Sequence, residues 1–270
     1  MKTLLRDPLT SLLGVAMALL VAVPVLAQDS SAPDDATPGP AATPPLVSPE
    51  AHAVLDRMTA YMQGLQSFSI ESRSTRDELL GFGYKLQNNE KASLVVQRPD
   101  KLRSEVSGDL RTRTFVYDGS KLVIYSPDDQ AYARIDAPDT IGKLIGGILD
   151  AGIELPLIDV LYQAAAGTLT EQVRNGVLVG DSVVEGVDCD HLAFRQADID
   201  WQLWVAKGAH PLPRKIVITT RHELGNPQFA AIMDWNLKPR ISASTFTFAA
   251  PQGAAEIPFD QPAAVAGAAQ

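Results

Sequence analysis

The segment from Glu90 to Ile135 decides the fold, and its sequence is EKASLVVQRPDKLRSEVSGDLRTRTFVYDGSKLVIYSPDDQAYARI. Leu94–Val96 is a continuous apolar run, and further β-prone runs follow it at short intervals. Asp118-Gly119 separates two of these runs, and it is a strong hairpin signal because glycine supplies the positive φ that a tight turn needs. Pro127–Asp129 marks the next turn. The segment therefore predicts at least four consecutive strands, an antiparallel meander that must bury one face.

The amino-terminal residues 1–27 predict a secretory signal peptide. Lys2 and Arg6 make a basic start, residues 9–25 are almost wholly apolar, and Val25-Leu26-Ala27 fits the small-x-small cleavage pattern. A retained membrane anchor is the alternative, but the apolar run is somewhat short for a span. Glutamine, not cysteine, follows Ala27, so the pattern excludes a bacterial lipoprotein. We expect a periplasmic protein with no stable membrane span after cleavage near Ala27.

The charge balance argues against nucleic acid as a partner. The chain has 23 Lys and Arg against 32 Asp and Glu, a formal net charge of −9 at pH 7, and an acidic surface repels nucleic acid and anionic membranes. Cys189 is the only cysteine, so no disulfide can form within the chain. Stability must therefore come from the hydrophobic core.

A disordered tether and then a long helix are expected ahead of the strands. Residues 28–47 are rich in Pro, Ala, Ser and Asp, which is typical of disorder. Ser48, Pro49 and Glu50 suit the N-cap, the first helical position and the helix dipole. Apolar residues follow at helical spacing, and they are Val54, Leu55, Met58, Tyr61, Met62 and Leu65. Such a stripe is either core or the wall of a ligand site.

Two short helices are predicted after Pro138. Apolar residues at 141, 144, 145, 148 and 149 follow the pattern of an amphipathic helix, although glycines at 142, 146 and 147 weaken it. A second apolar helix is expected after Pro156. The pair is either a packed cap or a movable lid, since glycine lowers the local cost of opening.

Strands resume at Val177 and give an α+β protein. The expected strands are 177–185, 189–196, 201–207, 214–221 and 229–237, with a possible last strand at 244–248. Together with the strand that begins at Phe68 and the meander, the count is about eleven. We therefore expect one domain over residues 48–253, followed by a disordered tail at 254–270. Its architecture would be a strongly bent antiparallel half-barrel with a long N-terminal helix and two lid helices on the concave face.

The densest cluster of chemically active side chains is Asp188-Cys189-Asp190-His191. In a strand, Cys189 and His191 would share one face, with the two aspartates on the other. A zinc site needs further ligands, and no histidine of the chain lies in an H-x-x-x-H frame, so a metal site is not expected. We favour a structural role for these four residues, and redox or nucleophilic use of Cys189 is the alternative.

Catalytic motifs are absent from the sequence. It contains no G-x-S-x-G elbow, phosphate-binding loop or dinucleotide-binding fingerprint, so we expect neither an enzyme nor a cofactor. Paired carboxylates around 188–200 are a weak hydrolase alternative. Trp201 and Trp204 lie on opposite faces of a predicted strand, and an exposed Trp204 would indicate a surface for a protein partner.

Several motifs, in order, resemble the superfamily of the periplasmic lipoprotein carrier LolA and receptor LolB. They are the signal peptide, the long first helix, R-P-x-K-x-R at 98–103, V-Y-D-G-S-K-L-V-I-Y-S-P at 116–127, the mid-chain helices and F-T-F-x-x-P-x-G at 246–253. The segment Asp188–Thr219 resembles, more closely, an uncharacterised group of predicted secreted bacterial proteins near that superfamily. The resemblance implies an eleven-stranded half-barrel with an apolar cavity for acyl chains. It would place the family's lid-facing arginine at Arg98.

These observations together predict a non-enzymatic periplasmic protein that binds a lipid, an acyl chain or another hydrophobic ligand. The alternative is a module that senses or binds an envelope protein with the same fold and no ligand. Arg98 is the expected lid latch, and no metal ligand or catalytic residue is assigned. The candidate cavity lining is Phe68, Ile70, Phe115, Tyr117, Val123 and Tyr125 on strands, with Ile145, Leu149 and Leu161 on the lid.

Overall fold

The fold is built on one long helix and two meanders of strands. The structure is a computed structural model, and it describes residues 46–150 and 156–258, which belong to one compact unit. The predicted signal peptide, most of the predicted tether and the end of the tail lie outside these residues. Within the described residues, no helix is long and apolar enough to cross a membrane.

Helix α1 (Pro49–Gly64) begins where the sequence predicts. The Ser48 hydroxyl accepts a hydrogen bond from Ala51 N at 3.3 Å, and Pro49 occupies the first turn. Val47 is buried and its neighbours bond to β7, with Ser48 N donating to Gly176 O at 2.9 Å. The predicted boundary of the tether at residue 47 is therefore wrong for Val47, because the Val47 side chain belongs to the core.

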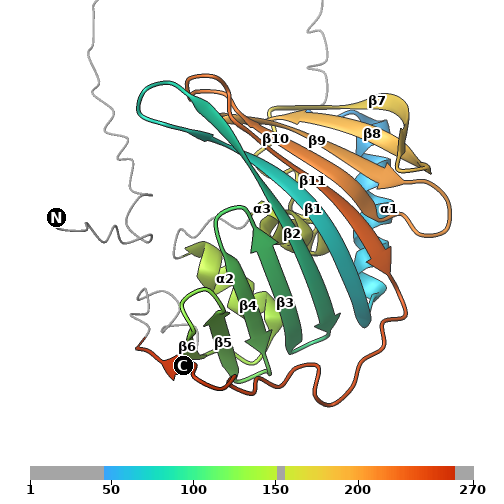
Figure 1. The fold of residues 1–270 in the computed structure, drawn as a ribbon. Coiled ribbons are helices and arrows are strands. Elements are labelled where there is room, and N and C mark those ends of the chain that lie inside the picture. The colour runs from blue at the N-terminus through green and yellow to red at the C-terminus, as the bar shows by residue number, and fades with distance from the viewer. Residues whose placement is uncertain (1–45, 151–155, 259–270) are drawn as a thin grey trace, which may run out of the picture. The chain divides into compact units, whose positions relative to one another are not determined.

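The first meander contains six antiparallel strands (Figure 1). The polar stretch 75–89 forms a hairpin, with exposed residues at its turn. The turn at Asp118-Gly119 is present, with Gly119 at φ +92° and the Asp118 carboxylate accepting from Lys121 N at 2.8 Å. The strands are β1 (Ser67–Leu79), β2 (Lys85–Gln97), β3 (Lys101–Gly108), β4 (Thr112–Tyr117), β5 (Lys121–Ser126) and β6 (Ala131–Asp136).

Two helices follow, and then a second meander. The helices are α2 (Ile141–Asp150) and α3 (Pro156–Ala166), as the sequence predicts. The strands are β7 (Asn175–Val184), β8 (Val187–Arg195), β9 (Ile199–Ala206), β10 (Pro213–Thr220) and β11 (Gln228–Asn236). A two-residue strand, β12 (Ala255–Glu256), ends the series.

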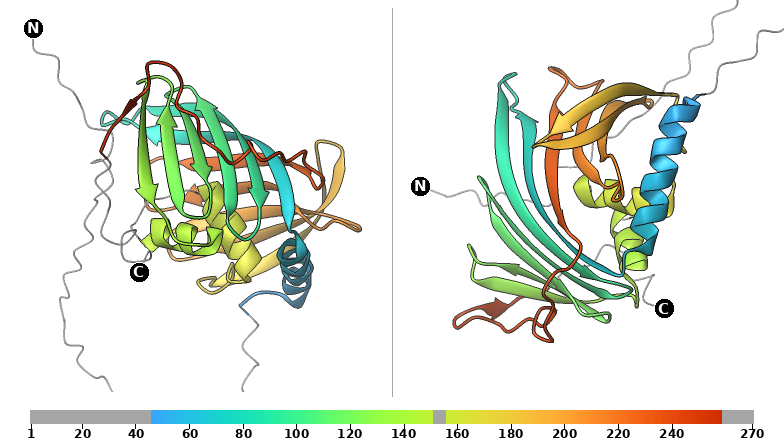
Figure 2. Two further views of the ribbon diagram at one scale, coloured as in Figure 1. Left: turned by 90° about the horizontal axis from the view of Figure 1, so that it is seen from below. Right: turned by 90° about the vertical axis from the view of Figure 1, so that its right-hand side faces the viewer.

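All strands form one sheet of order β12-β6-β5-β4-β3-β2-β1-β11-β10-β9-β8-β7. The two meanders join where β1 pairs with β11, with Ile70 opposite Trp235. The sheet bends strongly, and the three helices lie on its concave side (Figure 2). This confirms the predicted α+β half-barrel and the position of its helices.

The carboxyl-terminal segment differs from the prediction. Residues 244–248 form turns and irregular chain instead of a strand. Phe248 packs on the outer face, with ring centroids 5.6 Å from Tyr125 and 5.1 Å from Tyr132. β12 pairs in parallel with β6 inside the predicted disordered tail. The ordered domain therefore extends past residue 253, because aromatic packing and a short strand fix this segment.

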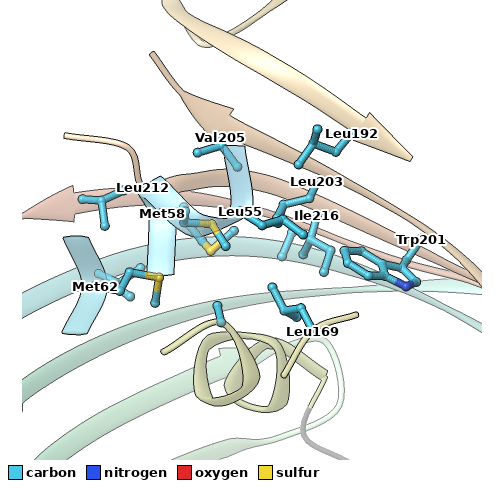
Figure 3. Close-up of a cluster of buried hydrophobic side chains, with 14 of the residues drawn as sticks. Leu55, Met58, Met62, Leu169, Leu192, Trp201, Leu203, Val205, Leu212 and Ile216 are labelled. Carbon is cyan, nitrogen blue, oxygen red and sulfur yellow. The ribbon is translucent and has the colours of Figure 1, made fainter. Parts of the chain in front are cut away.

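One part of the core lies between α1 and the second meander (Figure 3), and the same cluster continues to the first meander and α2. Leu55, Met58 and Met62 on one face of α1 meet Leu203 and Ile216 on the sheet. The methionine-bearing stripe of α1 is therefore core, which was the favoured of its two interpretations. This packing fixes the helix across the concave side of the sheet.

Replacing Met58 with alanine should lower the free energy of unfolding by about 2–5 kcal/mol, because Met58 is fully buried and alanine leaves a cavity. Urea denaturation followed by circular dichroism measures the change. His52→Ala on the exposed face of α1 is the control and should change stability by less than about 0.5 kcal/mol. Equal effects of the two substitutions would contradict the packing of α1.

Candidate functional site

The register of the strands puts a continuous row of side chains across the concave face. Residues paired on neighbouring antiparallel strands share a face. Ile70 pairs with Trp235 on one side and Leu94 on the other, and Phe115 pairs with Ile124. The row runs from β11 to β5 through Trp235, Ile70, Leu94, Ser104, Phe115 and Ile124.

A second concave row crosses the sheet nearer the β1–β2 turn. It contains Phe194, Trp201, Ile218, Phe229 and Arg76 on five neighbouring strands. Phe194 and Trp201 stack with ring centroids 4.0 Å apart and planes 20° apart. The Trp201 indole N–H is buried and has no hydrogen-bond partner within the described part of the chain. A buried donor of this kind is rare in folded proteins and marks a position where a polar acceptor would be stabilised.

Several apolar side chains of these rows are only half-buried, although they face the inside of the bend. They are Leu94, Phe115, Ile124, Ile218 and Phe229, which pack at the margin of the core. Phe68 and Ile70, at the foot of the sheet, are fully buried. The helices therefore cover the concave face incompletely, and an apolar surface remains inside the half-barrel.

The part of the concave face beneath α1 carries a cluster of buried hydrophobic side chains (Figure 3). The half-buried residues lie outside this packed region, and the apolar cavity between the sheet and the helices stays a prediction. Two open pockets, of about 490 and 310 Å³, lie elsewhere. Lys101, Asp118 and Phe246 line part of the first, and Asp181 and Lys207 part of the second. Neither pocket involves the two concave rows.

The predicted faces agree with the structure on β4 and are wrong on β5. Phe115 and Tyr117 face the concave side, but Val123 and Tyr125 face outward. The turn pairs Tyr117 with Leu122, so even-numbered residues of β5 face inward with odd-numbered residues of β4. Counting outward from Asp118-Gly119 would have found Ile124. The other missed residues, on β2, β10 and β11, depend on the long-range pairing of the two meanders.

Tyr117 is on the concave side but serves the core. It is fully buried, and its hydroxyl donates to the carbonyl oxygen of Pro138, just before α2. Burial, with the carboxylates of Asp100, Asp139 and Asp118, raises the pKa of Tyr117 to about 12. The phenol therefore stays neutral and keeps donating this bond at physiological pH.

The lid helices are fixed at both ends. Ile141 N at the start of α2 donates to Pro99 O at 2.9 Å, and Thr59 of α1 donates to Ala164 O near the end of α3, also at 2.9 Å. Gln63 donates to Ala165 O at 3.0 Å. The residues between α2 and α3 lie outside the described part.

The predicted lid residues face the sheet where they are described. Ile145 is buried and Leu161 is half-buried against the core. The side chain of Leu149 lies outside the described residues. Tyr162 of α3 lies beside Gly142 and Gly146 of α2, so the two helices pack on each other.

Arg98 is not a latch on the lid helices. Its Nη1 donates to Gln63 O in the last turn of α1 at 3.1 Å, and burial lowers the pKa of the guanidinium. Within the described residues no bond joins its side chain to α2 or α3. The sequence match places an arginine correctly at the helices, but the helix that it caps is α1.

Replacing Arg98 with alanine should lower the free energy of unfolding by about 1–2 kcal/mol, because one bond from a charged donor is lost. Dissociation of a bound apolar probe should keep its rate, since the residue holds α1 instead of the lid. Stopped-flow fluorescence measures that rate, and Arg98→Lys is the intermediate control. A faster release from Arg98→Ala would restore the latch interpretation.

The cluster Asp188–His191 is structural. Asp190 faces α1 and forms ion pairs with Arg57 at 3.2 Å and Lys207 at 3.5 Å. His191 is on the other face, as predicted, where its Nε2 lies 3.0 Å from Gln202 Oε1. Within the described residues, no group of three or more His, Cys, Asp or Glu could hold a metal ion.

Trp204 is not an exposed partner surface. It is only 8% exposed, it stacks on His191 with centroids 4.1 Å apart, and its indole donates to Ser182 at 3.1 Å. Lys215 Nζ lies 4.6 Å from its ring centroid. Trp201 and Trp204 therefore lie on opposite faces of β9, and both faces are covered.

Cys189 should be unreactive in the folded protein. It is fully buried, and burial raises the pKa of the thiol, so the nucleophilic thiolate is disfavoured. Ellman's reagent should label no thiol in native buffer and one thiol per chain in denaturant. Rapid labelling of the native protein would revive a redox or nucleophilic role.

The carboxylates around β8 and β9 are not a catalytic pair. Asp188 and Asp190 lie at one end of the β8–β9 hairpin, and Asp198 and Asp200 at the other. The Arg195 guanidinium lowers the pKa of Asp200 through two bonds of 2.7 Å. Opposite ends of the hairpin are too far apart for the two groups to act on one bond.

The bent sheet, the helices on its concave side and the incompletely covered apolar rows define an open α+β half-barrel. The chain belongs to the family described as "Predicted periplasmic protein (DUF2092)", whose model matches residues 51–260. This match confirms the resemblance to a group of predicted periplasmic proteins.

Solved structures of similar fold share little sequence with this chain. LprF from Mycobacterium bovis is 14% identical, with a TM-score of 0.47, and the match covers 73% of this chain and 97% of that one. Lipoprotein LppX from Mycobacterium tuberculosis is 14% identical, with a TM-score of 0.46, over 72% and 99%. A LolA superfamily protein from Nitrosomonas europaea is 11% identical, with a TM-score of 0.34, over 73% and 97%. No significant match to a curated protein was found.

Proposed function

We propose that the protein is a non-enzymatic periplasmic binding protein that holds an acyl chain of a lipid against its concave face. The observation that carries the proposal is the set of half-buried apolar residues inside the bend, among them Leu94, Phe115 and Phe229. Apolar side chains with a few placed polar groups are the usual lining of a ligand site. An elongated acyl chain fits a site that is a row along the sheet.

The polar chemistry of the two rows supports a ligand with one polar end. Trp201 supplies a buried donor without a partner among the described residues, and Arg76 ends the same row. An ester or carboxylate oxygen of a lipid would satisfy such donors, while its chain would cover the apolar residues of the rows. The N–H of Trp201 would then orient the ligand.

The helices α2 and α3 supply the cover of this site. Their outer ends are tied to the sheet and to α1 by the bonds at Ile141, Ala164 and Ala165. Between these bonds, Leu144 and Ile145 of α2 and Ala164 of α3 are buried in the core. In this proposal the two helices therefore act as a packed cover of the site.

The alternative of a ligand-free module for envelope proteins loses its main support. That interpretation depends on an exposed Trp204, and the side chain is buried beneath Ser182 and His191. Among the described residues we assign no nucleophile that contacts a base, which the hydrolase alternative would require. We therefore retain lipid binding as the proposal.

An uncharged apolar probe, N-phenyl-1-naphthylamine, tests the site directly. The folded protein should bind it saturably, with enhanced fluorescence that a fatty acid displaces. Leu94→Gln should weaken binding of the probe about tenfold. A polar side chain at this position removes apolar contact with the probe that contributes over about 1 kcal/mol to the free energy of binding. Native mass spectrometry of protein from a bacterial periplasm, followed by lipid extraction, would identify the cargo.

Val95→Gln is the matched control, because Val95 is half-buried on the same strand and faces the convex side. It should reduce stability as Leu94→Gln does but leave probe affinity unchanged. Circular dichroism establishes that both variants fold. Equal loss of affinity in the two variants, or no saturable binding by the wild-type protein, would refute the proposal.

A further inference from the structure

The hairpin of β1 and β2 continues beyond the residues with which β11 and β3 pair. Both strands have 13 residues, and their pairing continues to Leu79 and Lys85. β11 pairs with β1 only as far as Arg76. The last three residue pairs of the hairpin therefore extend past the neighbouring strand by roughly 10 Å, at about 3.3 Å per residue, and the turn lies beyond them (Figure 1).

The projecting turn carries large apolar side chains in water. Phe82 is 91% exposed and Tyr84 is 69% exposed, and Leu80 and Leu86 are also exposed. The turn sequence is Leu80-Gly81-Phe82-Gly83-Tyr84. A Cβ added at either glycine would have no atom within 4 Å, so this turn is open on both sides. Soluble proteins rarely expose neighbouring aromatic and aliphatic residues unless the surface has a function.

A second turn adds to the same surface. The β10–β11 turn lies beside the hairpin tip in both views (Figures 1 and 2), and its Leu224 is 78% exposed. The turns are in contact, because a Cβ at Gly225 would lie 3.6 Å from Leu79 Cδ2. We call the five residues Leu80, Phe82, Tyr84, Leu86 and Leu224 the apolar tip.

One ion pair lies at the base of the apolar tip. Asp77 and Lys85 form an ion pair of 3.0 Å, and the same carboxylate accepts from Gln228 N at 3.1 Å. Burial would raise the pKa of Asp77, but the bonds from Lys85 and Gln228 outweigh it and lower the pKa. This pair adds no net charge to the tip, whereas the exposed carboxylates of Glu78, which accepts from Asn88, and Glu223, beside Leu224, add negative charge.

We propose that the apolar tip inserts into the surface of a lipid bilayer. Tyrosine and other amphipathic rings favour the bilayer interface, and shallow insertion of apolar side chains drives binding there. The net charge of −9 disfavours anionic bilayers, so the surface should be a neutral one. A standard protein interface uses about 20–30 residues a side, and a projecting tip of five apolar residues is far smaller. The proposal does not depend on a ligand in the concave site.

Co-flotation with phosphatidylcholine vesicles tests the apolar tip in the protein purified from a bacterial periplasm. The wild-type protein should float with these vesicles, and less with vesicles that also contain phosphatidylglycerol. Phe82→Ser with Tyr84→Ser should weaken binding by at least about tenfold, because each ring carries roughly 150–250 Å² of surface. Binding of N-phenyl-1-naphthylamine should be unchanged, so that this test is separate from the proposed function.

The control is Val179→Ser with Val183→Ser, since these valines on β7 are also exposed but lie away from the tip. This variant should bind vesicles as the wild-type protein does. In a Phe82→Trp variant, vesicles should shift the emission to shorter wavelength. No vesicle binding by the wild-type protein, binding that survives loss of the two rings, or an equal loss in the control would overturn the proposal. So would a tip-dependent complex with an envelope protein in the absence of vesicle binding.

Discussion

The antiparallel pairing of β1 with β11 is the interaction on which the rest of the structure depends. It joins two meanders that are separated along the chain by α2 and α3 into one sheet. Ser69 pairs with Asn236, so the contact closes almost the whole domain into a loop. Such contacts cost more closure entropy than local ones and tend to form slowly. This pairing completes both concave rows, because it places Trp235 beside Ile70 and Phe229 beside Arg76.

Local signals in the sequence predict local structure well. Ser48 caps α1, and Asp118-Gly119 turns β4 into β5, because each depends on hydrogen bonds within a few residues. The predicted faces failed on β5, where a register counted from the wrong residue reverses every side chain. Val123 and Tyr125 are apolar enough to lie on either face of the sheet. Tyr125 lies on the outer face, where it packs against Phe248 from a distant segment.

The candidate site was harder to predict because it consists of what the core leaves uncovered. Sequence periodicity cannot distinguish Ile70, which is fully buried, from Leu94, which is half-buried on the paired strand. The polar residues show the opposite behaviour. Asp190 and Cys189, which attract chemical interpretation in the sequence, are engaged in an ion pair and in the second, smaller core. The residues of the candidate site are instead apolar side chains that the core leaves half-buried.

The carboxyl-terminal strand has a consequence for the behaviour of many copies together. An open sheet has two free edges, and unpaired edges invite aggregation through strand addition. β12 covers part of β6 with a parallel bridge at Ala255 and Glu256. At the other edge, β7 carries an irregularity near Gly180 and an exposed charge at Asp181. The half-barrel can thus remain open on its concave side without offering a regular edge to another copy of itself.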